Sequence, residues 1–192
     1  MVALRCTAKL LKRLKLPAKP PVPEAQANPL GEWYADIDFW NRKPYVVMLN
    51  AATGATLMLN GNAAGLRVLH ERAAVQFASL CEYYGIDSDK VDAEVAALQA
   101  GFVFGATADR SLLASINQRK LLAWQRFELD GCSLAEAASL EWQGFFKHPK
   151  LPRTTRYMDW HRPLELLQQH LLPPAQIIVF PRGRAAQPAD SG

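Results

Sequence analysis

The chain has 192 residues, of which 49% are hydrophobic and 21% charged, the composition of an ordinary globular domain. No segment holds the ~20 consecutive apolar residues that a membrane-spanning helix needs, and the N-terminus lacks the apolar core of a secretory signal, so we expect a cytoplasmic protein. Cys6, Cys81 and Cys132 lie far apart without a Cys-x-x-Cys pair, which indicates free thiols rather than a zinc or redox site.

The net charge of +4 is concentrated at the N-terminus. The first twenty residues hold no acid and six cations, which are Arg5, Lys9, Lys12, Arg13, Lys15 and Lys19, while the rest of the chain has two more acids than bases. Such a cluster can attract nucleic acid, an anionic membrane or an acidic protein. It is also the composition of a solvated helix face, and the sequence leaves both interpretations open.

The first thirty residues predict a strand, a helix and a connector. Residues 2–6 are typical of a short strand, and Thr7 is a suitable N-cap for a helix over 8–16. Pro17 ends that helix, and five prolines between Pro17 and Pro29 predict a stiff linker. We expect residues 1–16 to belong to the same domain as 31–175, with 17–30 as linker and 181–192 as a disordered tail.

Residues 32–60 predict three consecutive strands joined by short turns. Trp33, Ala35, Ile37 and Phe39 recur at every second position, as on one face of a strand. The run Val46–Leu49 is apolar without alternation, which is typical of a strand covered on both faces. The stretch therefore predicts an antiparallel meander over 33–40, 45–50 and 55–59.

The remaining chain is mostly helical in pattern. We predict helices over 66–84, 88–98, 109–127, 133–146 and 163–171, the fourth with a capping box of Ser133 and Glu136, and strands over 101–106 and 176–180. The predicted fold class is α+β. Its small antiparallel sheet consists of the meander plus one or two strands, from 2–6 and 101–106, and amphipathic helices cover it.

The helix predicted over 109–127 carries polar residues along its apolar stripe. A helical wheel places Leu113, Ile116, Trp124 and Phe127 on one side with Lys120 among them. A cation there either bridges to buried polar groups, faces a cleft, or extends past the stripe into water. The candidate polar cleft consists of Arg110, Ser111, Asn117 and Lys120.

Evidence for metal binding or catalysis is weak. Asp36 and Asp38, with Glu32 before them, share a strand face and could hold Mg²⁺, but Asp-x-Asp is more often a solvated outer face. The four histidines have no zinc spacing, and the chain has no phosphate-binding glycine loop and no Gly-x-Ser-x-Gly elbow. We expect no metal and no cofactor, and the sequence leaves open whether the chain is an enzyme.

Three stretches together resemble an uncharacterised bacterial family, a domain of unknown function. They are Leu4–Leu11, Gly31–Ala35 with Asn41–Lys43, and Asp109–Asn117, and the resemblance runs from Leu4 to about Leu171. The third stretch is similar to a family pattern Asn-Arg-Ser-Val-Leu-Gly-Ser-Met-Asn, with Asp109 in place of the first Asn and Ala114 in place of the Gly. The family implies no activity, but its matched positions include Arg110, Ser111 and Asn117.

Three hypotheses for function follow. The first is a binding module for an anionic partner, nucleic acid or an acidic protein, whose candidate anion-binding residues are Lys9, Lys12, Arg13, Lys15, Arg42 and Lys43. The second is an enzyme or ligand-binding protein with the polar cleft described above. The third is a subunit in which a protein partner buries Trp33, Tyr34 and Trp40. The oligomeric state stays open.

Overall fold

A five-stranded sheet forms the centre of the fold. The structure, a computed structural model, describes residues 1–24, 26–147 and 160–173. The strand order is β4-β3-β2-β1-β5, with β1 at Val2–Cys6, β2 at Trp33–Trp40, β3 at Lys43–Asn50, β4 at Thr56–Asn60 and β5 at Phe102–Ala106. The fold class is α+β, as predicted.

The sheet is mixed rather than antiparallel. Strands β2, β3 and β4 form the predicted antiparallel meander. Strand β1 runs parallel to both its neighbours, β2 and β5, so the prediction of a purely antiparallel sheet was wrong. The connection over residues 7–32 is long enough to cross the sheet and return in the same direction, as parallel neighbours require. Hydrophobic periodicity carries no information on strand direction.

The helices follow the predicted order with some changes in their bounds. They are α1 at Ala8–Arg13, α2 at Ala63–Arg67, α3 at Leu69–Tyr83, α4 at Asp89–Gln99, α5 at Arg110–Leu129, α6 at Leu134–Gln143 and α7 at Pro163–Leu171. The predicted helix over 66–84 is thus two helices. Helix α6 has the predicted capping box, and it ends before β6 (Phe146–Lys147), which pairs with β7 (Trp160–His161). The predicted strand over 176–180 and the tail over 181–192 lie outside the described residues.

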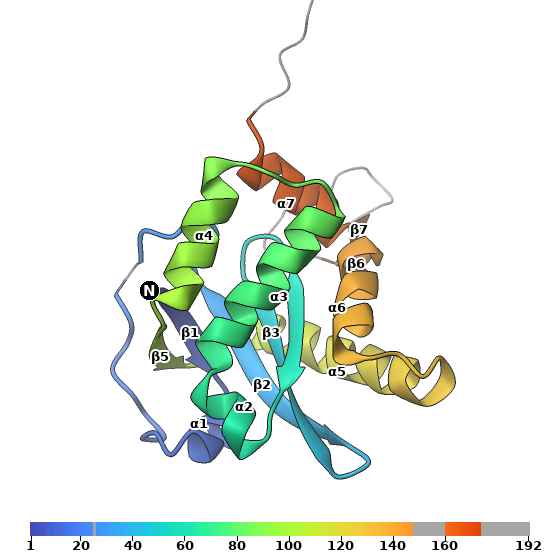
Figure 1. The fold of residues 1–192 in the computed structure, drawn as a ribbon. Helices are drawn as coiled ribbons and strands as arrows, with labels where there is room; N and C mark the ends of the chain where they lie inside the picture. Colours follow the sequence, from blue (N-terminus) through green and yellow to red (C-terminus); the bar gives the residue numbers. More distant parts are fainter. Residues whose placement is uncertain (25, 148–159, 174–192) are drawn as a thin grey trace, which may run out of the picture.

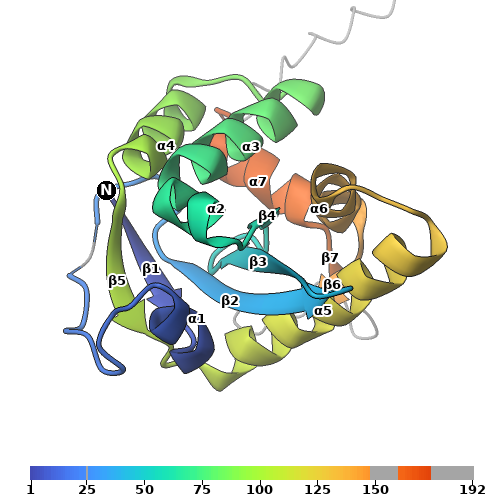
Figure 2. The same ribbon diagram turned by 60° about the horizontal axis from the view of Figure 1, so that its bottom comes forward.

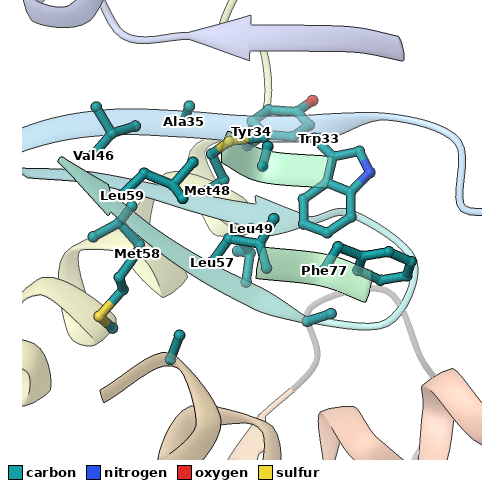
Figure 3. Packing of buried hydrophobic residues seen from close by; sticks show 14 of the residues in the cluster. Trp33, Tyr34, Ala35, Val46, Met48, Leu49, Leu57, Met58, Leu59 and Phe77 are labelled. Atoms are coloured by element: carbon teal, nitrogen blue, oxygen red, sulfur yellow. The ribbon is translucent and has the colours of Figure 1, made fainter. Parts of the chain in front are cut away.

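Helices cover both faces of the sheet. Figure 2 shows α3 and α4 on one face and α5 on the other. Phe77 of α3 meets Trp33 of β2 edge to face, with 6.1 Å between the ring centroids (Figure 3). A single hydrophobic cluster extends from Val2 in β1 to Leu171 in α7.

Where β1 ends, helix α1 takes its place beside β2. Strand β1 stops at Cys6, opposite Ala35, and α1 then contacts β2 at Asp38 and Phe39. The turn between β2 and β3 has positive φ at Asn41 (48°) and Arg42 (62°), the backbone of a tight hairpin turn. Helix α1 and this turn therefore lie at the same end of the molecule, the lower end in Figure 1.

Candidate functional site

Three acids, one directly before β2 and two within it, pair with side chains among the first nine residues of the chain. The guanidinium of Arg5 lies 2.6 Å from a Glu32 oxygen, and the Thr7 hydroxyl donates to Asp36 Oδ1. Lys9 Nζ lies 3.3 Å from Asp38 Oδ1. We call this set the polar ladder, and its members are Arg5, Thr7, Lys9, Glu32, Asp36 and Asp38.

Lys120 of α5 approaches the polar ladder from the other side. Its ammonium donates to Asp36 Oδ2 at 2.7 Å and to Asn117 Oδ1 at 3.2 Å, and lies 3.5 Å from Asp38 Oδ2. Burial by itself lowers the pKa of Lys120, but the hydrogen bond and charge of Asp36, together with Asp38, raise it above the usual lysine value. Lys120 is therefore a cation at neutral pH and supplies the counter-charge for Asp36, which is 6% exposed.

A pocket of about 300 Å³ opens beside this ion pair, between the β2–β3 hairpin and α5. It is lined by Asp38, Phe39, Tyr45, Asn117, Lys120, Leu121 and Trp124. The Tyr45 hydroxyl donates to the Lys120 carbonyl at 3.4 Å. Burial, with the charges of Asp38 and Asp36, raises the pKa of Tyr45, so its phenol stays protonated. The pocket therefore combines three aromatic rings with a charge-balanced set of polar groups.

The structure brings together two of the four predicted cleft residues. Asn117 and Lys120 line the pocket, whereas Arg110 and Ser111 lie at the exposed start of α5 and line no part of it. Ser111 instead donates its backbone N–H and its hydroxyl to Asp109, the N-cap of α5. An N-cap needs a side-chain oxygen, and Asp supplies one as well as the Asn of the family pattern does.

The buried stripe of α5 shares Ile116 and Phe127 with the predicted one, but its other members lie one position earlier in the chain. Its members are Leu112, Ile116, Arg119, Ala123 and Phe127, so the prediction was wrong for Leu113, which is half-buried, and for Trp124, which is exposed. The cation at the centre of the buried stripe is thus Arg119, a residue that the sequence analysis missed.

Arg119 joins three elements inside the protein. Its Nε donates to the Thr56 hydroxyl of β4 at 2.7 Å and lies 4.0 Å from Glu141 Oε2 of α6. Its guanidinium carbon lies 4.8 Å from the centroid of the Phe146 ring in β6. Burial lowers the pKa of Arg119, and Glu141 opposes that shift. Arg119 is 2% exposed, so its role is structural.

Glu94 of α4 is a second buried charge that sequence patterns did not indicate. It is fully buried and accepts hydrogen bonds from the Asn28 amide, the Leu30 backbone N–H and the Trp33 indole, at 2.9–3.1 Å. Burial raises its pKa, and these hydrogen bonds oppose the rise. Glu94 thereby fixes the end of the proline-rich segment to the core.

The two aspartates are not arranged for a metal ion. Lys120 and Lys9 occupy their carboxylates, and Asp36 is buried, so the expectation of a solvated outer face was wrong for that residue. Within the described residues, no three His, Cys, Asp or Glu side chains come close enough to share an ion.

The predicted anion-binding residues fall into two groups. Lys9 is bound to Asp38 in the polar ladder. Five cations are exposed and make no ion pair in the described part of the chain, namely Lys12, Arg13, Lys15, Arg42 and Lys43, which we call the free cations. Lys9 and Arg13 both lie over the Phe39 ring, 5.2 and 5.3 Å from its centroid. Phe39 also lines the pocket, so α1 directly adjoins it.

Two of the three aromatic residues of the third hypothesis are not available to a partner. Trp33 is fully buried and Tyr34 is 3% exposed, both in the protein's own core, so that prediction was wrong for these two residues. Trp40 donates its indole N–H to Glu128 of α5.

A larger groove of about 1300 Å³ lies between α3 and α6. Its lining is mainly apolar and includes the exposed side chains of Val75 and Tyr83. Met58 of the edge strand β4 lies along it, and Gln76 of α3 binds both backbone groups of Met58. The groove does not touch the polar ladder.

Comparison with known proteins identifies the family. None of the described helices is long and apolar enough to cross a membrane. No curated protein and no solved structure matches the chain. The resemblance seen in the sequence is confirmed, because the chain belongs to the family Domain of unknown function (DUF6933), whose model matches residues 3–166.

Proposed function

We propose that this protein is a small binding module that docks an anionic partner, nucleic acid by preference, through α1 and the β2–β3 turn. One observation carries the proposal: the five free cations lie on α1 or just after it and at the β2–β3 turn or the start of β3, two segments at the same end of the fold, and Arg13 lies over the Phe39 ring. Cations so placed can neutralise several phosphates at once and release their counterions.

The pairing of charges separates residues that support the fold from residues that can bind. Arg5, Lys9 and Lys120 are each bound to a carboxylate, so their charge is balanced within the protein. The free cations have no such acceptor, and their removal leaves no buried carboxylate unpaired. They can therefore be replaced without loss of the fold.

The geometry favours binding over catalysis at Lys120. A lysine that acts as base or nucleophile needs a lowered pKa and a free lone pair. The pKa of Lys120 is raised, and three oxygen acceptors surround its ammonium. This is the arrangement of a structural cation.

The test is fluorescence anisotropy of a labelled single-stranded oligonucleotide, titrated with protein at several salt concentrations. Replacement of Lys12, Arg13 and Lys15 by Ala removes three free cations and should reduce the slope of log K against log salt by about 2, at ~0.7 for each phosphate contact. The double variant Arg42→Ala/Lys43→Ala should reduce it by about 1.4 on the same basis.

The matched control is Arg67→Ala/Arg72→Ala, which removes two exposed cations from α2 and α3. It should bind as the parent protein does. Binding that is insensitive to salt, or equal loss in the control and in Arg42→Ala/Lys43→Ala, would contradict the proposal.

A further inference from the structure

We propose that the pocket between the β2–β3 hairpin and α5 holds one unstacked nucleobase, so that the partner of this surface is single-stranded nucleic acid. The inference deepens the proposed function and rests on it. It assigns the pocket to the base and the free cations around it to the phosphates.

The rings of the pocket suit a planar group. Phe39 and Trp124 are 40% and 49% exposed, although both side chains are large and apolar. They come from different elements, β2 and α5, and line the same space of about 300 Å³. This volume is at the lower end of small-ligand pockets, and stacking on aromatic rings is the main way in which proteins hold single-stranded bases.

The polar groups of the pocket suit a neutral ligand rather than a phosphate. The charges of Asp36 and Asp38 are balanced by Lys120 and Lys9. The Lys120 ammonium already donates to Asp36 and Asn117 and lies 3.5 Å from Asp38, so its charge is directed at the protein's own acids rather than at a bound anion. Asn117 accepts from Lys120 through Oδ1, which leaves its NH₂ group to donate to a base edge.

The surroundings of the pocket suit the backbone that such a base carries. Arg13 lies over the Phe39 ring, 5.3 Å from its centroid, and Lys43 is two residues before Tyr45 on the same face of β3. Cations therefore border the pocket on the side of α1 and on the side of the hairpin turn. A base inside a duplex is paired and stacked and cannot enter, so the site selects unpaired nucleotides.

The experiment compares three labelled ligands of equal length by anisotropy: a 12-nucleotide oligothymidylate, the same strand with abasic sites throughout, and a duplex. The abasic strand keeps the phosphates and lacks the bases. We expect the parent protein to bind oligothymidylate at least tenfold more tightly than the abasic strand, because base stacking on an aromatic ring has an effect of this size.

Replacement of Trp124 tests the pocket directly. Trp124→Ala should weaken binding of oligothymidylate by tenfold or more and leave binding of the abasic strand unchanged, while Trp124→Phe, which keeps an aromatic face, should restore most of the affinity. Leu129→Ala is the matched control, since Leu129 is 80% exposed on the same helix and lies outside the pocket.

The outcomes separate this inference from the proposed function. Equal, salt-dependent binding of oligothymidylate and the abasic strand would overturn the base pocket and leave anion binding intact. Preference for the duplex would also overturn it. Binding to neither strand, with binding to an acidic peptide such as polyglutamate, would overturn the nucleic-acid partner altogether.

Discussion

Lys120 shows how a single side chain links two parts of the sequence that are far apart. It lies on α5, while the acids that it binds lie on β2. Its side chain is 14% exposed and that of Asp36 is 9% exposed, so the pair is largely shielded from water. Removal of one partner leaves the other charge buried and unpaired, which costs more than the pair contributes when intact.

Lys120→Met should therefore lower the free energy of unfolding by about 3 kcal/mol, because Asp36 loses its counter-charge. Urea unfolding followed by circular dichroism measures this change. Lys12→Met is the control, as Lys12 is exposed and unpaired, and it should change the stability by less than about 0.5 kcal/mol. A loss of the same size in both variants would contradict the role assigned to the ion pair.

The Lys120→Met variant should also differ from the parent protein in how its stability changes at alkaline pH. The pKa of Lys120 is higher in the folded protein than in the unfolded chain, so its stabilisation is complete below the unfolded value, about pH 10, and is lost as the pH rises through the folded value. The parent protein should lose stability in this alkaline range. The Lys120→Met variant should lack this part of the decline, and a decline of unchanged size would count against the assignment.

At the scale of single residues, the sequence predicted part of the site. Asn117 and Lys120 were identified, because a cation next to an apolar stripe is visible in the helical pattern. Arg119 was missed because apolar residues of α5 fall on two neighbouring stripes. Its partners, Thr56 and Glu141, are distant in sequence, so periodicity could not show which stripe is buried.

At the scale of elements, the edge strand β4 is protected by side chains of two helices. Gln76 of α3 accepts from the Met58 N–H at 2.8 Å and donates to the Met58 carbonyl at 3.0 Å, as a neighbouring strand would. Trp142 of α6 donates to the Thr56 carbonyl at 2.9 Å. Unprotected edges invite pairing with other chains, and these contacts prevent it.

Gln76→Ala should lower the free energy of unfolding by about 1–2 kcal/mol, since both backbone groups of Met58 lose a partner. Gln76→Glu is the informative comparison. Its carboxylate can still accept from the N–H but cannot donate to the carbonyl, so it should lose a similar amount at neutral pH. Thermal unfolding of both variants measures the effect, and a Gln76→Glu protein as stable as the parent would contradict it.

Local signals in the sequence predicted most elements, and non-local pairing explains the exceptions. Ser88, Asp109 and Ser133 each cap a helix through a bond to a residue two or three positions ahead, which is a short-range pattern. The direction of β1 depends on how residues 7–32 return to the sheet. The spacing of apolar residues within the five residues of β1 cannot show how this connection returns to the sheet.

At the scale of the molecule, the first strand is an interior member of the sheet. Leu4 of β1 is fully buried. It pairs with Trp33 of β2 on one side and with Phe104 of β5 on the other. The hydrophobic cluster joins it to the helices on the far side of the sheet. We therefore expect residues 1–16 to unfold together with residues 31–147 and 160–173.

Leu4→Ala should lower the stability of the whole protein by about 2–5 kcal/mol through the cavity that it leaves. Tryptophan fluorescence and far-ultraviolet circular dichroism should report the same shifted midpoint, as one cooperative transition requires. Val22→Ala, at a side chain that is 77% exposed, is the control and should unfold as the parent does. Two separate transitions in either protein would show that the N-terminal segment is an independent unit.

The position of β1 has a consequence for synthesis of the chain. Residues 2–6 are made before every other strand of the sheet, yet one of their two neighbours, β5 at residues 102–106, is made about a hundred residues later. Until then one side of β1 is an open edge that carries apolar side chains, and such edges are sites of misassembly. We therefore expect a nascent chain to be most open to misassembly in the period between translation of β2 and of β5.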